Sequence, residues 1–141
     1  MESITVKAGK YWLGDPCYII SSTDDWNDLC NQAAEQEEDV DRVWIYDINT
    51  SAGKAVVCGT AHGDGVFYSS DNHEIGVDSG LIGLVPFEYN PEGVGPDSHL
   101  VTFTKDFVVS NDDGNMSFGP IKVETADPYY PEDSNQYGEE W

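Results

Sequence analysis

Short runs in which apolar and polar residues alternate make up most of the chain, and turn-forming residues separate them. A period of two is typical of strands that bury one face. Strands are expected at residues 3–7, 10–13, 42–48, 54–58, 65–68, 74–78, 81–85, 99–103, 106–110, 115–118 and 121–125. The segments NTSAG (49–53) and NDDG (111–114) are typical of hairpin loops. The pattern predicts a mainly β (α+β) fold, a small antiparallel β-sandwich or barrel.

One segment instead has the spacing of a helix. It follows Ser22 or Thr23, either of which can cap it, and Asp24, Asp25 and Asp28 suit the positive end of its dipole. Its apolar positions recur at helical intervals and predict one stripe that packs on the sheet, formed by Trp26, Leu29, Cys30 and Ala33. Residues 17–20, just before it, are expected to be extended, and 35–41 to be a solvated acidic run.

The regular pattern ends near residue 126. Residues 1–126 are expected to form a single β-rich domain, and 127–141 (DPYYPEDSNQYGEEW) an acidic, aromatic-containing flexible tail. The tail has two interpretations: a loose terminus, or a segment whose Tyr129, Tyr130 and Trp141 dock on a basic partner.

Charge narrows the possible partners. The chain has 27 acidic and 6 basic residues, a formal net charge of −21. Nucleic-acid binders cluster Lys and Arg to displace counterions from phosphates, whereas the basic residues here are scattered singly along the chain. Direct binding to nucleic acid or to an anionic membrane is therefore not expected. A basic protein surface is the expected partner, and the residues predicted to meet it are Glu35, Glu37, Glu38, Asp39, Asp41, Tyr129, Tyr130 and Trp141.

Three cysteines at wide spacing, Cys17, Cys30 and Cys58, form neither a disulfide framework nor a zinc pattern. Neither a signal peptide nor a membrane-spanning stretch is visible in the sequence. A reduced, cytoplasmic protein is the interpretation that these features favour.

Polar side chains gather in GTAHGDGVFYSSDNHEIGVDSG, residues 59–80. This stretch offers oxygen and imidazole ligands for a divalent cation: His62, Asp64, Asp71, His73, Glu74 and Asp78. Their spacing matches no named metal loop, and the glycines among them equally indicate tight turns. Asp15, in Gly-Asp-Pro, either caps a nearby amide or joins Asp64 and Asp78 in a carboxylate cluster.

Three segments, GDPCYII (14–20), GTAHGDGVFY (59–68) and VDSGLIGLVP (77–86), resemble those of small uncharacterised bacterial and phage proteins, which carry GDPCY, GTAxGDGxY and VD[SA]GxIGxVP motifs. The resemblance spans roughly residues 10–125. It implies a β-rich fold, an origin in a phage or in its bacterial host, and one neighbourhood for Asp15, Asp64 and Asp78. It supplies no activity, and His62 departs from the aromatic residue expected at its position.

Two classes of function compete. The first is a phage-type acidic binding protein, a host-defence inhibitor or DNA mimic that occupies a basic groove of a host protein. The second is a metal- or small-ligand-binding protein, or a hydrolase, in which Asp15, Asp64 and Asp78 hold a divalent cation. Because high acidity also serves solubility alone, the first class needs a defined acidic face. The charge balance favours a binding protein over an enzyme.

Overall fold

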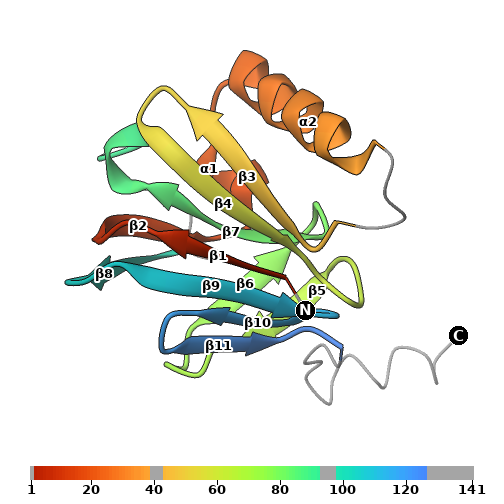
Figure 1. Ribbon diagram of the computed structural model, residues 1–141, viewed down its shortest axis with the longest axis vertical. Coiled ribbons are helices and arrows are strands. Elements are labelled where there is room, and N and C mark those ends of the chain that lie inside the picture. Colours follow the sequence, from red (N-terminus) through yellow and green to blue (C-terminus); the bar gives the residue numbers. More distant parts are fainter. Residues whose placement is uncertain (1, 39–42, 93–97, 127–141) are drawn as a thin grey trace, which may run out of the picture.

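The computed structural model describes residues 2–38, 43–92 and 98–126. Figure 1 shows their arrangement. The strands of this part are β1 (Glu2–Val6), β2 (Gly9–Gly14), β3 (Ile45–Thr50), β4 (Gly53–Gly59), β5 (Gly65–Tyr68), β6 (Glu74–Val77), β7 (Leu81–Pro86), β8 (His99–Phe103), β9 (Phe107–Asp112), β10 (Asn115–Phe118) and β11 (Ile121–Glu124). The helical elements are α1 (Pro16–Ile19), α2 (Thr23–Glu37) and the 3₁₀ turn η1 (Phe87–Tyr89).

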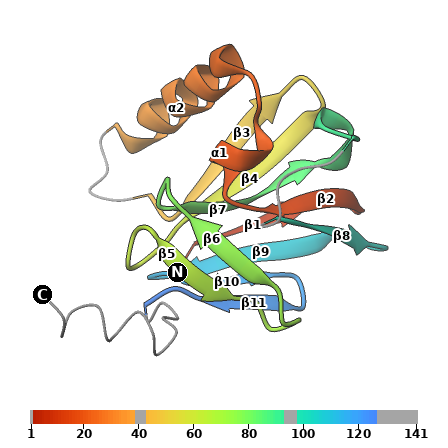
Figure 2. The same ribbon diagram turned by 180° about the vertical axis from the view of Figure 1, so that it is seen from behind.

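The strands pair antiparallel in two sheets and a hairpin, which confirms the mainly β prediction. One sheet has the order β3-β4-β7-β2-β8, the other β1-β9-β10-β11, and β5 pairs with β6. Figure 2 shows the β5–β6 hairpin lying across the other strands on the side away from the viewer of Figure 1. All eleven described strands contribute apolar side chains to one core between them, which is the arrangement of a sandwich closed on one side.

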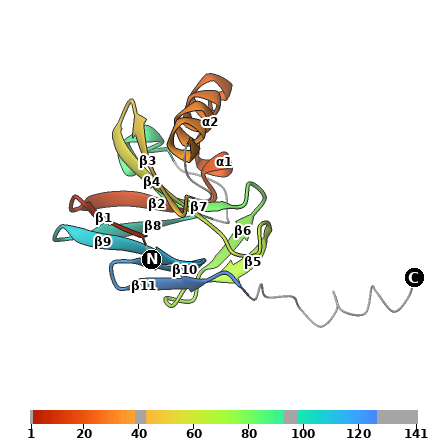
Figure 3. The same ribbon diagram turned by 45° about the vertical axis from the view of Figure 1, so that its right-hand side comes forward.

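The five-stranded sheet is buried on both faces. In β4, Val56 and Cys58 belong to the core shared with the second sheet, whereas Ala55 and Val57 pack with the helices. Leu29 of α2 and Ile19 of α1 complete that second core, and Figure 3 shows both helices on the same side of this sheet. Burial on two faces explains why β4 is a continuous apolar run rather than an alternating one.

Helix α2 covers the open edge of the five-stranded sheet. The Gln32 side-chain amide donates to the Asn49 carbonyl at 2.9 Å and accepts from its N–H at 2.8 Å. Gln36 pairs in the same way with Asp47, at 2.8 and 3.0 Å. These bonds satisfy backbone groups that edge strand β3 would otherwise offer to another chain. The helix therefore protects the sheet as well as packing on it.

The predicted helix is confirmed, with two corrections. Trp26, Leu29 and Ala33 pack inward as expected, but Cys30 is exposed, because the polar Gln32 and Gln36 share the inner face with the apolar residues. The helix also continues to Glu37, so 35–37 are helical rather than part of a loop.

Residues 17–19, predicted to be extended, instead belong to helix α1, whereas the Ile20 backbone after it is extended as predicted. Pro16 stands at the start of α1, where its missing N–H costs nothing, and Asp15 caps the Cys17 N–H. The turn after β9 follows the prediction: Asp113 and Gly114 both have positive φ, at 51° and 100°. A two-residue turn with positive φ at both positions has a twist that matches that of the flanking strands. No described helix is both long and apolar enough to span a membrane.

Candidate functional site

Asp15 is fully buried, and protein groups occupy its carboxylate. Oδ1 accepts from the Cys17 N–H at 2.9 Å and from the Ser79 hydroxyl at 2.6 Å. Oδ2 accepts from the backbone N–H groups of Asp78 at 2.7 Å and Ser79 at 2.9 Å. A carboxylate has about four acceptor positions, so these donors use its capacity. The arrangement is that of a clamp between the start of α1 and the loop after β6.

Asp64 and Asp78, the other two acids of the predicted cluster, lie on the surface. Both are exposed, and both line a hollow of about 380 Å³ together with Tyr18. The loop before Asp64 is ordered by Thr60, whose hydroxyl donates to the Gly63 carbonyl at 2.6 Å and accepts from its N–H at 2.7 Å. The structure therefore places Asp15 beside the backbone of Asp78, and the side chain of Asp78 in one hollow with that of Asp64.

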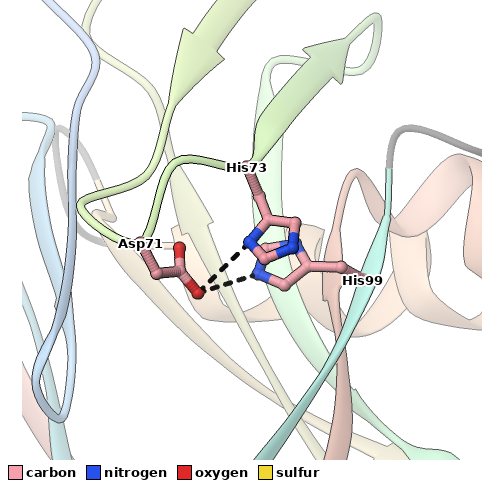
Figure 4. Close-up of side chains that lie close together, drawn as sticks. All are labelled: Asp71, His73 and His99. Atoms are coloured by element: carbon pink, nitrogen blue, oxygen red, sulfur yellow. Dashed lines mark ion pairs between the residues drawn. The ribbon is translucent and has the colours of Figure 1, made fainter.

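A different trio brings its ligand atoms together. Within residues 2–38, 43–92 and 98–126, one group of three His, Cys or acidic residues has its ligand atoms within 4.8 Å of one another: Asp71, His73 and His99. Asp71 Oδ2 lies 3.4 Å from His73 Nδ1 and 3.3 Å from His99 Nε2. The two imidazoles are stacked, with centroids 3.7 Å apart and planes at 10° (Figure 4).

The β5–β6 turn that carries Asp71 and His73 is held on both sides. Ser69 in this turn donates its hydroxyl to Asp71 Oδ1 and accepts from the His73 N–H at 3.1 Å. The neighbouring Ser70 joins the turn to β11, donating from its N–H to the Lys122 carbonyl at 2.8 Å and accepting from the Lys122 N–H at 2.9 Å. Asp71 therefore keeps Oδ2 directed at the imidazoles while Ser69 holds Oδ1.

His99, the first residue of β8, comes from a distant part of the sequence. Its side chain is only 12% exposed. Both ring nitrogens are buried, and neither has a hydrogen-bond partner among the described residues by strict geometry. Nε2 does lie within ion-pair distance of the Asp71 carboxylate, at 3.3 Å. A buried polar group without a partner is costly and invites a functional explanation. The sequence pattern identified Asp71 and His73 as candidate ligands but missed His99. A strand pattern does not indicate which residues of other strands lie beside it in the fold.

The trio is electrostatically coupled. Burial lowers the pKa of His99, and His73 lowers it further, while Asp71 opposes both effects. Burial by itself would raise the pKa of the Asp71 carboxyl, but the Ser69 hydroxyl and the two imidazoles outweigh it, and this pKa is lowered. The balance favours a carboxylate beside a neutral buried imidazole, the protonation states in which both are ligands.

Three of the acids predicted to meet a partner belong to the end of α2. Glu35, Glu37 and Glu38 are exposed at its C-terminal end. Glu37 also accepts from the Tyr46 hydroxyl at 2.9 Å. The other predicted contact residues lie outside the described residues: Asp39, Asp41, Tyr129, Tyr130 and Trp141.

One cavity gathers lysines that are scattered in the sequence. It has about 420 Å³, and Lys7, Lys10 and Lys54 line it. Lys54 is paired with Asp47 at 3.2 Å and Lys7 with Asp106 at 3.7 Å. Two of the three ammonium groups thus have carboxylate partners, and the cavity presents no strong excess of positive charge for phosphates.

Cys17 lacks the electrostatics of a nucleophile. Burial, with the nearby Asp15 carboxylate, raises the pKa of its thiol to about 12. A thiol in this state is inert at neutral pH, because the thiolate is the reactive form.

Comparison of the chain with family models, with curated proteins and with solved structures finds no match in any of the three. The resemblance to bacterial and phage proteins, carried by the three sequence motifs, stays a prediction.

Proposed function

We propose that this protein is an acidic binding protein that occupies a basic, nucleic-acid-binding surface of a partner protein. The solvent-exposed surface of α2 is the contact surface of this proposal. One observation carries it: exposed carboxylates gather at both ends of the helix, with Asp24, Asp25 and Asp28 near its start and Glu35, Glu37 and Glu38 at its end. The described helix contains no Lys or Arg to offset them.

The end of α2 departs from what helix stability favours. The last turn has no basic residue, and Glu35, Glu37 and Glu38 stand where the helix dipole is negative. A carboxylate in such a position opposes the dipole by roughly 0.3–1 kcal/mol at low ionic strength. Local rules are most often broken at functional sites, where another requirement overrides them. Partner binding is the requirement we propose.

The density of charge along the helix supports mimicry of nucleic acid. Six acids lie between residues 24 and 38, a length of roughly 21 Å at about 1.5 Å per residue. The mean axial spacing is therefore about 4.2 Å per charge, against about 3.4 Å for one DNA strand and 1.7 Å for the duplex. A basic groove shaped for phosphates would meet a comparable linear field here.

The partner in this proposal is a protein of a bacterial host. The resemblance to phage proteins supports that origin, and a DNA-binding groove of a defence protein or nuclease offers the basic surface required. Electrostatic complementarity of this kind speeds encounter and selects against acidic partners. Binding is therefore expected to weaken steeply as salt shortens the Debye length from about 10 Å at 0.1 M to about 3 Å at 1 M.

The test compares two double charge reversals of equal net charge. Glu35→Lys with Glu38→Lys alters the proposed contact surface, and Asp112→Lys with Glu124→Lys alters exposed acids of β9 and β11, strands on the opposite side of the molecule from α2 (Figure 1). Host-lysate proteins retained by the immobilised wild-type chain are eluted with duplex DNA and identified. The first variant is expected to lose these proteins at least 10-fold, and the second to keep them.

Stability separates loss of function from loss of fold. The α2 double reversal is expected to melt at the same temperature as the wild type or higher, because it places cations at the negative end of the helix. Equal loss of binding in both variants would show that only net charge matters. Retention by the α2 variant, or captured proteins that DNA fails to elute, would refute the proposal.

A further inference from the structure

We propose that Asp71, His73 and His99 form a binding site for a zinc-type divalent transition-metal ion, with Asp71 Oδ2, His73 Nδ1 and His99 Nε2 as the ligands. The site lies where the β5–β6 turn meets the first residue of β8 (Figure 4). It does not depend on the acidic face of α2, and it replaces the ligand set Asp15, Asp64 and Asp78 expected from the sequence.

The ligand separations have the size that a tetrahedral ion imposes. Bonds of about 2.0–2.1 Å at the tetrahedral angle hold two ligand atoms roughly 3.3–3.4 Å apart. Asp71 Oδ2 lies 3.4 Å from His73 Nδ1 and 3.3 Å from His99 Nε2. Two of the three edges of the ligand triangle thus already match the ion, and all three atoms lie within 4.8 Å.

The donor set selects the class of ion. Two imidazole nitrogens and one carboxylate oxygen suit zinc, cobalt, nickel or iron, whereas magnesium and calcium prefer oxygen ligands alone. Three protein ligands leave a fourth position for water or for an exogenous donor, as in catalytic rather than structural zinc sites. Because the side chains of His73 and Asp71 are partly exposed, this fourth position would be open to solvent.

The groups around the trio provide part of what a metal site requires. Ser69 holds the second oxygen of Asp71, which is the kind of outer contact that orients metal-binding carboxylates. The buried nitrogens of His99 have no hydrogen-bond partner among the described residues, so an ion would satisfy one of them.

Binding requires one movement. The imidazole planes are nearly parallel, at 10°, and two parallel rings cannot both direct an in-plane lone pair at one ion. His73 is the ring that turns, because its side chain is 51% exposed on a turn, whereas that of His99 is only 12% exposed. Metal binding is therefore coupled to unstacking of the two rings.

The experiment uses the full chain with Zn²⁺ and Co²⁺ as probes, in about 100 mM salt and millimolar Mg²⁺ so that surface carboxylates are screened and occupied. Calorimetry is expected to give one Zn²⁺ per chain. His73→Ala is expected to weaken binding more than 10-fold, and His62→Ala, which alters an exposed histidine outside the trio, is expected to leave it unchanged. Asp71→Asn supplies the second ligand variant. The side chains of Asp71 and His73 both lie on a surface turn, where a substitution is expected to affect folding least.

Imidazole ¹⁵N spectra provide an independent readout that does not depend on variants. Zn²⁺ is expected to shift Nδ1 of His73 and Nε2 of His99, and to leave His62 unchanged. The bound Co²⁺ is expected to show the intense visible bands of four-coordinate cobalt. Binding weaker than about 100 μM, equal losses in the His62 and His73 variants, or shifts at the opposite ring nitrogens would each overturn the proposal.

Discussion

Replacing Asp15 with asparagine tests whether this residue is a structural clamp or a metal ligand. An amide presents one acceptor oxygen and one NH₂ group, whereas four donors converge on the native carboxylate. In the least costly orientation the NH₂ takes the place of Oδ1, and the Ser79 hydroxyl turns to accept from it. The Cys17 N–H then meets another donor and stays unpaired. Two backbone amides, of Asp78 and Ser79, retain an acceptor.

The cost follows from these contacts. A hydrogen bond to a charged group contributes about 1.5–3 kcal/mol, which includes much of the penalty for leaving its partner buried and unpaired. The remaining three bonds become neutral and lose about 1 kcal/mol each at most. Asp15→Asn is therefore expected to destabilise the fold by roughly 1.5–6 kcal/mol, or to lower the melting temperature by roughly 5–25 °C in a domain of this size.

Urea and thermal unfolding followed by circular dichroism, with and without EDTA, measure this effect. Asp64→Asn and Asp78→Asn are the matched controls, because both side chains are exposed and surface changes are usually within about 0.5 kcal/mol. A loss below about 1 kcal/mol for Asp15→Asn would refute the clamp. So would a loss that disappears in EDTA, since it would mean that a bound metal, not the amide network, needs the carboxylate.

Two further predictions concern titrating groups. Cys30 is exposed and is expected to react with iodoacetamide in the folded protein. Burial raises the pKa of the Cys17 and Cys58 thiols, so these two are expected to react only on unfolding. More than one adduct in the mass spectrum of the folded chain would contradict this prediction. Burial and the bond to Asp25 at 2.5 Å raise the pKa of Tyr89 to about 12. Because the unfolded value is about 10, the stability from this contact is complete below pH 10 and lost between pH 10 and 12; Tyr89→Phe should flatten that part of the pH–stability profile.

Much of the fold could be predicted, because strands and turns depend on local patterns. Asp113 and Gly114 form the two-residue turn that their residue types favour, and Leu29 packs inward as its helical spacing requires. The inner face of α2 was less predictable. Gln32 and Gln36 pair with an edge strand that no helical period reveals, and Cys30 is left outside.

The candidate site was predictable only in part, for the same reason. The density of polar residues in 59–80 identified Asp71 and His73 among six candidate ligands, but it could not rank them. Their third partner, His99, begins a strand in another sheet. Asp15 and Asp78 were expected to be neighbours, and they are, yet the contact is from carboxylate to backbone.

The amino-acid sequence by itself determined the acidity, the strand-rich class and the positions of the turns, because charge, alternation and turn chemistry are properties of neighbouring residues. The tertiary structure alone decided which polar groups meet. Asp15 became a buried clamp because α1 and the loop after β6 direct four donors at it. His99 joined Asp71 and His73 because the β5–β6 turn lies against the start of β8, and a distance between side chains exists only once such elements are packed.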